Sequence, residues 1–267
     1  MTEPSPPEVL VERRGHVAII TLNRPEARNA CNQAVWLGVG QALDEADADP
    51  EVRVVVITGA GDKSFCAGAD LKAISQGQRV VPEDPAKAAW GFAGIVNHPI
   101  SKPIIAAVNG AALGGGSEIA LASDLVVAAE GARFGLPEVK VGLIAAAGGV
   151  FRLPRQVPIK QAMEMILTGE PIDARRALEL GLVNRVVPQD ELMSTALALA
   201  DKIAANAPLA VQASKRIALG IVDGQFSREP GDWEVNAKDV AVLSSSEDAR
   251  EGPRAFAEKR APQWKAR

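Results

Sequence analysis

The chain of 267 residues has a net charge of −4, with 47% hydrophobic and 23% charged residues. These values suit a globular protein with one large domain, or one domain and a small helical appendage. The acidic balance argues against non-specific binding to nucleic acid or to an anionic membrane, because both need a basic surface. A local basic patch for a phosphorylated ligand remains compatible with this charge.

The two cysteines, Cys31 and Cys66, form no CxxC motif and no cluster with histidine. We therefore expect no metal site, and a reducing, cytoplasmic location is the simplest interpretation. The longest apolar run, 103–123, contains four glycines and Glu118. A membrane span tolerates such a cluster poorly, so we interpret this run as buried soluble core.

The first half of the chain alternates strands with helices. A hairpin is predicted around Gly15 and His16, followed by a helix over 33–48 that Asn32 caps. Three further apolar strands and a short helix follow, and a glycine-rich turn and helix separate the last two strands; the strands span 52–58, 104–108 and 125–129, and the short helix spans 71–76. This order predicts an α/β fold with a largely parallel sheet.

Between the short helix and the strand 104–108, residues 78–88 have no clean period and two prolines, so we expect a mobile loop there.

From Ile159 onward the chain is mainly helical. Asp173 and Ser246 stand where helix N-caps belong, and 183–187 predicts one short strand. Helical spacing of apolar residues covers 159–167, 174–180, 191–206, 209–221 and 233–243.

The segment 64–72, Ser-Phe-Cys-Ala-Gly-Ala-Asp-Leu-Lys, places small residues in a loop directly before a helix. Such a loop lets the backbone approach a ligand closely, and N–H groups at the helix start can donate to an anion. The alternative is an ordinary tight loop, which is the more common explanation for a short glycine motif taken alone.

Three consecutive glycines, 114–116, precede Glu118 at a predicted helix start. Each glycine costs roughly 1 kcal/mol against alanine inside a helix. Either an oxyanion hole or tight helix packing explains them. Glu118 is the only charged residue between Lys102 and Asp124, so we expect a desolvated carboxyl with a raised pKa. The alternative is a glutamate that reaches solvent at the helix edge.

Glu138 follows Pro137 in the segment 134–143. By itself this position is typical of a surface glutamate or of an acid in the first turn of a helix, which the helix dipole favours. Together, however, the segments resemble the crotonase superfamily in order and spacing, and enoyl-CoA hydratases most closely in motif. The resemblance covers about 9–264. The segments that carry it are 66–71, 102–110, 114–118, 134–138, 148–149 and 251–260.

The resemblance implies a core of repeated ββα units over 1–200 and a C-terminal helical trimerisation region over 201–267. It implies homotrimers or homohexamers that bind acyl-CoA thioesters, with no cofactor besides the CoA of the substrate. The backbone N–H groups of Ala69 and Gly115 would form the oxyanion hole. Glu118 would act as the base on a water molecule, and Glu138 would deliver a proton to C2.

The implied activity is that of an enoyl-CoA hydratase, with fatty-acid β-oxidation, sterol breakdown and amino-acid catabolism all open as pathways. Alternatives are an isomerase or another crotonase-type lyase, and a non-catalytic acyl-CoA binding protein. The chain has no tyrosine, which excludes variants with a catalytic tyrosine. His16 and His98 lie outside the motifs, so we expect them to be structural or surface residues.

The resemblance also implies contacts with CoA, from the backbones of Ala67 and Ala69 near the adenine and from Lys72 and Arg28 near the phosphates. Plain solvation is the alternative for the basic side chains. The chain departs from the family at 145–147, where Ala146 replaces a glycine and would narrow the acyl pocket or shift the loop. The full set of implied CoA contacts is Arg28, Ala67, Ala69, Asp70, Leu71, Lys72, Phe256 and Lys259.

Overall fold

A six-stranded sheet forms the centre of the molecule. The structure is a computed structural model that describes residues 6–267, without the side chain of Phe256. The strand order is β1-β2-β3-β5-β7-β10, in which only the β1–β2 pair is antiparallel. The large sheet thus confirms the predicted hairpin and parallel strands. Its strands are β1 (Val9–Arg14), β2 (Val17–Leu22), β3 (Val54–Gly59), β5 (Ile104–Val108), β7 (Leu125–Ala129) and β10 (Arg185–Val187).

A second sheet has the order β4-β6-β8-β9, and these short strands escaped prediction because two or three residues show no period. The pairs β3/β4, β5/β6 and β7/β8 each give one strand to each sheet, which confirms the repeated units. Its strands are β4 (Ser64–Cys66), β6 (Ala111–Leu113), β8 (Arg133–Gly135) and β9 (Ile172–Asp173), and a separate small hairpin joins β11 (Ile221–Val222) to β12 (Gln225–Phe226).

Eleven helices and four 3₁₀ turns are found within residues 6–267. The helices are α1 (Gln33–Ala48), α2 (Leu71–Ser75), α3 (Pro85–Ala88), α4 (Gly115–Ala122), α5 (Gly149–Gln156), α6 (Ile159–Thr168), α7 (Ala174–Glu179), α8 (Leu192–Ala204), α9 (Pro208–Leu219), α10 (Pro230–Ser245) and α11 (Glu247–Ala257). The turns are η1 (Pro25–Ala27), η2 (Phe92–Gly94), η3 (Pro137–Val141) and η4 (Gln189–Glu191).

The predicted helix caps are confirmed. The side chains of Asn32 and Asp173 accept hydrogen bonds from N–H groups three residues later, and Ser246 Oγ accepts one from the N–H of Ala249. The expected loop over 78–88 is wrong in its second half, where Asp84 caps the one-turn helix α3. That helix is too short to leave an apolar period in the sequence.

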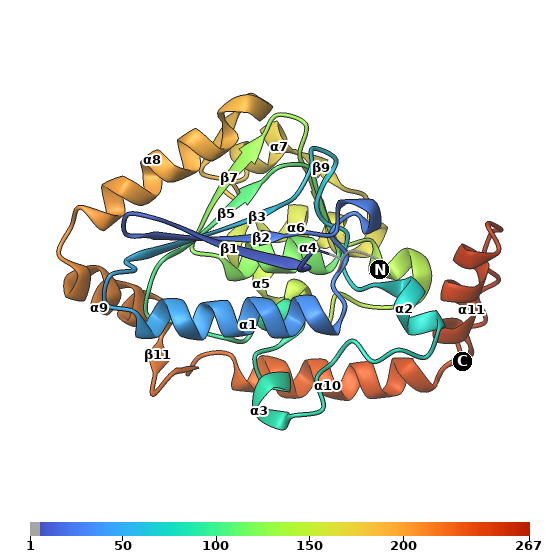
Figure 1. Ribbon diagram of the computed structural model, residues 1–267. Coiled ribbons are helices and arrows are strands. Elements are labelled where there is room, and N and C mark those ends of the chain that lie inside the picture. The colour runs from blue at the N-terminus through green and yellow to red at the C-terminus, as the bar shows by residue number, and fades with distance from the viewer. Residues whose placement is uncertain (1–5) are drawn as a thin grey trace, which may run out of the picture.

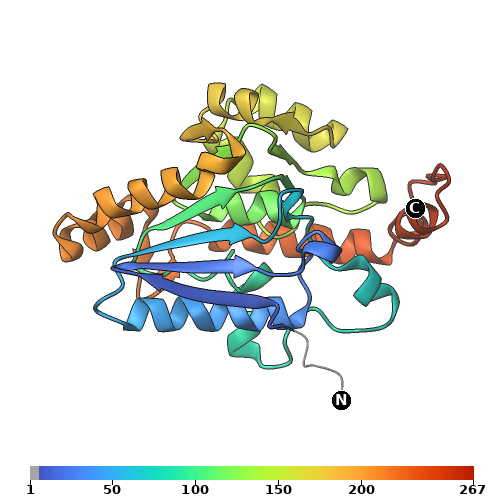
Figure 2. The same ribbon diagram turned by 45° about the horizontal axis from the view of Figure 1, so that its top comes forward.

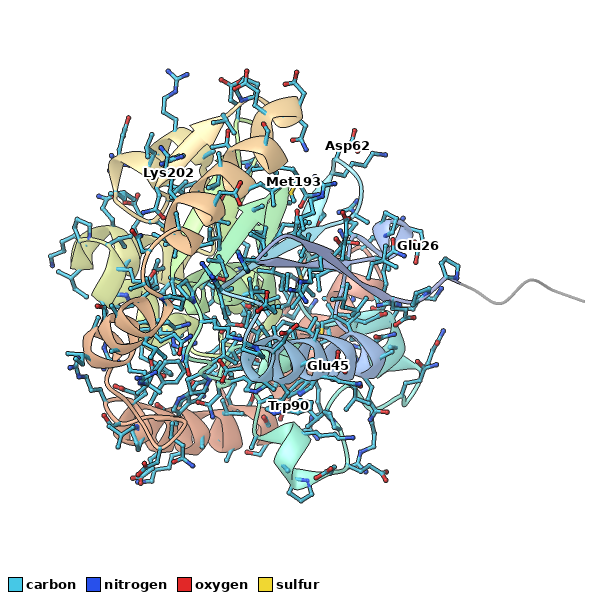
Figure 3. The ribbon with its side chains drawn as sticks, turned by 60° about the vertical axis from the view of Figure 1, so that its left-hand side comes forward. Glu26, Glu45, Asp62, Trp90, Met193 and Lys202 are labelled. Carbon is cyan, nitrogen blue, oxygen red and sulfur yellow. The ribbon has the colours of Figure 1, made fainter. Side chains whose placement is uncertain are left out.

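Helices cover both faces of the large sheet (Figure 1). On one face, α8 buries a row of alanines at every fourth position, and this row lets the helix lie close to the strands. The opposite face packs against α1, α4 and the small sheet. Figure 3 shows the two covering layers, with Met193 and Lys202 on α8 and Glu45 on α1. The small sheet and α4 therefore lie on the face of the large sheet opposite to α8.

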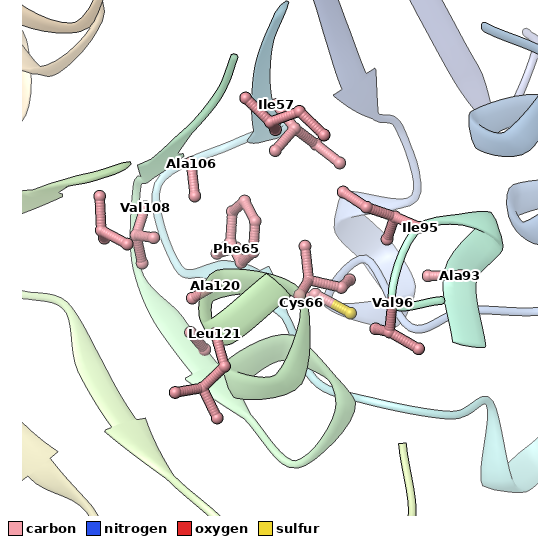
Figure 4. Close-up of a cluster of buried hydrophobic side chains, with 14 of the residues drawn as sticks. Ile57, Phe65, Cys66, Ala93, Ile95, Val96, Ala106, Val108, Ala120 and Leu121 are labelled. Atoms are coloured by element: carbon pink, nitrogen blue, oxygen red, sulfur yellow. The ribbon is translucent and has the colours of Figure 1, made fainter. Parts of the chain in front are cut away.

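Within this core, α4 packs against β4. Phe65 and Cys66 of β4 are fully buried against Ala120 and Leu121 of α4, and Val96 lies on the other side of β4 (Figure 4). A cysteine behaves here as a small hydrophobe, and both cysteines are free thiols in the interior. This packing fixes α4 relative to the loop that follows β4.

The C-terminal helices extend beyond the sheets. The expected boundary between residues 200 and 201 falls within α8, which packs on the sheet. By contrast, α9 buries none of its residues and α10 buries only Asn236, while Leu209, Ile217 and Val242 are more than 70% exposed. In Figure 2, α11 lies at the far end of α10, away from the sheets. The role of 201–267 in trimer formation stays a prediction.

Over the described range 6–267, no helix combines the length and the apolar character that a bilayer crossing requires.

Gly116 lets α4 approach β4, because a Cβ added to this residue would lie 2.0 Å from the carbonyl oxygen of Cys66. We expect Gly116→Ala to lower the free energy of unfolding by about 1–3 kcal/mol through overpacking. Urea denaturation would measure the change. Gly131→Ala is the matched control, since its added Cβ meets no atom within 4 Å. A Gly116→Ala protein as stable as the control would contradict this account of the contact.

Candidate active site

The glycine-rich start of α4 places Glu118 inside the protein. Gly114 precedes the helix with a φ of 55°, a left-handed conformation that favours glycine. Glu118 follows one turn later and is only 3% exposed. The N–H of Gly149, the first residue of α5, donates to Glu118 Oε1 at 2.9 Å. The sequence prediction of a desolvated carboxyl is thus confirmed, and the alternative of a solvent-exposed glutamate is wrong.

The loop after β4 presents a free amide at Ala69. Residue Cys31 donates its N–H to the Gly68 oxygen and accepts from the N–H of Asp70, forming a parallel bridge. In such a bridge the N–H of Ala69 faces away from Cys31. Within residues 6–267 this N–H donates to no protein acceptor. The loop is therefore held rigidly while one amide stays available.

The second free amide belongs to Gly115. It is the first residue of α4, where the N–H has no intrahelical acceptor, and it donates to no acceptor in the described part of the chain. A Cβ on Gly68 would lie 3.3 Å from the Gly115 nitrogen, so the loop and the helix start are in contact. The two predicted oxyanion-hole amides are thus brought together at one place.

Glu138 reaches the same place from η3. Its Oε1 lies 2.6 Å from the position that a Cβ on Gly114 would take. Its Oε2 is buried and has no hydrogen-bond partner among the described residues. A buried, unpartnered carboxylate oxygen is uncommon in folded proteins and indicates a site for a ligand or water. The interpretation of Glu138 as a surface acid is therefore wrong, because η3 turns its side chain inward.

The two carboxyls have perturbed acidity. Burial, followed by the charge of Glu138, raises the pKa of Glu118 to about 8, and the Gly149 N–H opposes this shift. Burial raises the pKa of Glu138 to about 7. The pair therefore retains a proton near neutral pH, as general acid–base chemistry requires.

The predicted CoA contacts divide into three groups. Ala67, Leu71 and Lys72 are exposed on the loop and first turn beside Ala69, and Arg28 is exposed next to them, its carbonyl accepting from the Ala67 N–H. These side chains are available to a ligand.

The Asp70 carboxylate has a structural task instead. It caps α2 by accepting from the Ala73 N–H and pairs with Arg24 at 2.8 Å, which holds its pKa below the usual range despite burial. A direct side-chain contact of Asp70 with CoA is therefore not available in this conformation.

The C-terminal candidates lie at the end of α11. Lys259 is exposed, and the side chain of Phe256 lies outside the described residues. Helix α11 packs against η3, where a Cβ on Gly252 would lie 2.0 Å from the Val141 oxygen. The C-terminal segment thus contacts the turn that carries Glu138, but no ligand contact of Phe256 or Lys259 follows from this packing.

Sequence reasoning assigned no individual role to three residues that shape the site. Gly149 donates to Glu118, and the ring of Phe92 lies against Gly115, where a Cβ would approach it to 2.3 Å. Arg152 lies behind Glu118 and lowers its pKa through its charge. The glycine pair 148–149 was the signal for Gly149, and the glycine run 114–116 includes Gly114, which makes room for Glu138. Among the described residues, no group of three or more His, Cys, Asp and Glu side chains is arranged to hold a metal ion.

Comparison with known proteins agrees with this geometry. The family model for enoyl-CoA hydratase/isomerase matches residues 12–267. The chain belongs to the enoyl-CoA hydratase/isomerase family. As a member it is an enoyl-CoA hydratase-type enzyme of the crotonase superfamily, which confirms the fold class and the enzyme class expected from the motifs.

The similar proteins carry two kinds of name. A carnitinyl-CoA dehydratase of Salmonella typhi is 45% identical over 96% of this chain and 97% of its own length. The enoyl-CoA hydratase EchA19 of Mycobacterium tuberculosis is 44% identical over 100% and 99%. Among solved structures, a carnitinyl-CoA hydratase from Mycobacterium avium has a TM-score of 0.96 and 61% identity, covering 98% of this chain and 100% of that one.

The raised pKa values predict how stability depends on pH. A carboxyl of pKa 4.5 in the unfolded chain and about 7 or 8 in the folded chain binds more protons when folded. Its contribution to stability is therefore fully present below pH 4.5 and is lost as the pH rises to about 8. We expect the free energy of unfolding of a Glu118→Gln/Glu138→Gln protein to fall less over this range, as measured by urea denaturation.

The exposed residue Glu130 provides the control, because Glu130→Gln should leave the pH dependence of the wild-type protein unchanged. Equal slopes in the wild-type and the doubly substituted protein would show that the two carboxyls do not have the raised pKa values described above.

Proposed function

We propose that this enzyme adds water reversibly to the 2,3-double bond of a 2-enoyl-CoA, giving a 3-hydroxyacyl-CoA. The observation that carries the proposal is the meeting of two acids of raised pKa, the buried Glu118 and the partly buried Glu138, with two free amides at the start of α4. Acids alone would fit many lyases, and amides alone would fit any crotonase-type reaction. The combination supports hydration in particular, since that reaction needs both a base for water and an acid for carbon.

The reaction would proceed through an enolate of the thioester. Ionised Glu118 removes a proton from water, the water oxygen bonds to C3, and the π electrons move to the thioester oxygen. The N–H groups of Ala69 and Gly115 stabilise the negative oxygen. Protonated Glu138 then transfers its proton to C2, the carbonyl re-forms, and one proton has moved from water to carbon overall. The unpartnered Oε2 of Glu138 leaves an acceptor for the substrate or water.

The reverse reaction uses the same two acids in opposite roles, because Glu138 then removes the C2 proton while Glu118 protonates the leaving hydroxyl. The second candidate, a dehydratase acting on a 3-hydroxyacyl-CoA such as carnitinyl-CoA, is supported by the similar proteins of that name.

The acyl group separates these candidates. A carnitinyl group carries a trimethylammonium, which proteins often bind with aromatic rings. The rings of Phe151, Phe226 and Trp233 cluster behind α5, but the guanidinium of Arg152 lies over all three at 5.3–5.7 Å. Their faces are thus already occupied by a cation. This observation favours an uncharged acyl group, and Ala146 in place of a glycine favours a narrow one.

The CoA moiety would lie along the loop that follows β4. Exposed Lys72 and Arg28 offer two positive charges to its phosphates, and Ala67 and Ala69 offer backbone next to the adenine. Leu71, 40% exposed, offers an apolar surface. In the proposed assembly, trimers form through the exposed apolar helices α9 and α10, and Phe256 and Lys259 reach the CoA of a neighbouring subunit. The CoA of the substrate serves in place of a separate cofactor.

Glu118→Gln and Glu138→Gln test the proposal. We expect each change to lower kcat for hydration of crotonyl-CoA by at least about 10²-fold, because a positioned acid or base contributes that much. Loss of the enoyl absorbance measures the rate, and Glu130→Gln is the control. Retention of the rate in both variants would refute the two-acid mechanism, and tight CoA binding without turnover of any enoyl-CoA would indicate a binding protein.

A kinetic panel tests the acyl group. We expect a higher kcat/KM for crotonyl-CoA than for crotonobetainyl-CoA, because the rings of Phe151, Phe226 and Trp233 already face the Arg152 guanidinium and are not available to the trimethylammonium. The two substrates differ by this charged group at C4, so they are a matched pair. A clear preference for crotonobetainyl-CoA would overturn the choice of an uncharged acyl group and support the dehydratase candidate.

A further inference from the structure

One face of α10 contacts the structure that holds Glu118. Residues at positions 229, 232, 233 and 236 recur with helical spacing, and each contacts α5 or the loop before it. Since α10 is otherwise largely exposed, this face is its main attachment to the core. Hereafter the α10 latch denotes three of these residues, Glu229, Trp233 and Asn236; Asp232, which pairs with the more exposed Arg155, lies outside it.

The strongest contact of the α10 latch is an ion pair with Arg152. The Nε and Nη2 atoms of Arg152 donate to the two carboxylate oxygens of Glu229 at 3.0 and 2.7 Å. Arg152 is 5% exposed, and its Nη1 finds no hydrogen-bond partner among the described residues. Trp233 donates from its ring to Glu229 at 3.3 Å and stacks edge-on against Phe151. Arg152 is thus fixed in orientation rather than solvated.

Arg152 lies directly behind the reaction centre. It is on α5, one turn after Gly149, whose N–H donates to Glu118. A Cβ on Gly148 would lie 3.4 Å from Arg152 Cδ, so the arginine chain folds back along the start of α5. The side-chain amide of Asn236 donates to the Ala146 oxygen at 2.9 Å and so holds the same loop from its other end.

We propose that Arg152 is a positioning residue for Glu118: the α10 latch fixes its guanidinium and the Gly149 amide behind this carboxyl, so that the C-terminal helical region adjusts the acid at the reaction centre. The proposal rests on the proposed function for the role of Glu118. It adds to that function the residues 229–236, which lie more than a hundred positions away in sequence.

Few other charges face Glu118. Glu138 approaches from η3, and the thiol of Cys66 lies on β4, but burial raises the pKa of this thiol to about 12 and keeps it neutral. The other elements packed against α4, namely η2, β5 and β6, carry no charged side chain. Arg152, paired with Glu229, is therefore the main positive charge near Glu118, and its effect on the pKa of Glu118 is opposite to that of Glu138.

Charge variants of the pair test the proposal because they act in opposite directions. Arg152→Met removes a positive charge and raises the pKa of Glu118, so the acidic limb of the kcat–pH profile should move up by about one pH unit. Glu229→Gln leaves Arg152 uncompensated and should move the limb down. The kcat–pH profile of the double variant should lie close to that of the wild-type protein. Arg152→Lys keeps the positive charge, so its profile should also lie close to that of the wild-type protein.

The control is Arg155→Met, which breaks the more exposed pair Arg155–Asp232 on the same two helices and should leave the profile in place. A purely structural role would lower kcat in both single variants without opposite displacements, and that result would overturn the proposal. The same displacement in Arg155→Met would also overturn it.

A second measurement does not depend on turnover. The pKa of Glu118 is obtained from the pH dependence of urea unfolding, by comparing each variant with the same variant in a Glu118→Gln background. The two single variants should again displace it in opposite directions. If no enoyl-CoA is hydrated but these displacements appear, the proposed function fails and the positioning of Glu118 stands; if turnover occurs without them, the positioning fails alone. The double variant carries no unpaired buried charge, so we expect it to fold even if a single variant folds poorly. The pKa of Glu118 in the double variant can then still be compared with the pKa of Glu118 in the wild-type protein.

Discussion

The burial of the Glu118 carboxyl at the start of α4 is the constraint on which the rest of the site depends. A carboxylate this poorly exposed is costly unless it is protonated or given partners. The protein supplies one hydrogen bond from Gly149, one neighbouring acid at Glu138 and a positive charge at Arg152. These three influences oppose one another, and their balance leaves the pKa near the pH at which an acid–base catalyst is useful.

The alternation of strands between two sheets creates this place. Each unit sends one strand to the large sheet and the next to the small sheet, so the loop after β4 and the loop after β6 emerge side by side. The first loop carries the Ala69 amide and the second leads into Gly115. Because both loops leave neighbouring parallel strands, two amides distant in sequence point to one position.

Small residues then determine how closely the parts approach. Gly116 lies against the Cys66 carbonyl, Gly115 against the Phe92 ring and Gly114 against Glu138. Any side chain at these three positions would meet an atom closer than contact distance. The run of glycines therefore satisfies both explanations that the sequence left open, because the helix packs tightly and its first amide also stays unpaired. The helical cost of glycine is offset by the packing of α4 in the core.

The sequence by itself determined the local elements and the chemical class. Apolar periodicity gave the central strands and helices, Asn32 and Asp173 marked their helix starts, and Glu118 stood out as a lone acid in an apolar run. The ordered motifs identified the superfamily and named the amides of Ala69 and Gly115. Such features are predictable because they depend on neighbours a few residues apart.

Only the tertiary structure decided where Glu138 points and what lies behind Glu118. In sequence Glu138 resembles a surface acid, and its carboxylate oxygen Oε2 is buried because η3 turns the side chain toward Gly114. Gly149 lies 31 positions from Glu118, and Glu229 lies 77 positions from Arg152. Contacts over such separations depend on how helices and sheets pack, which no local pattern encodes. The asymmetric surroundings of the two acids, and with them their pKa values, therefore arise from packing rather than from residue type.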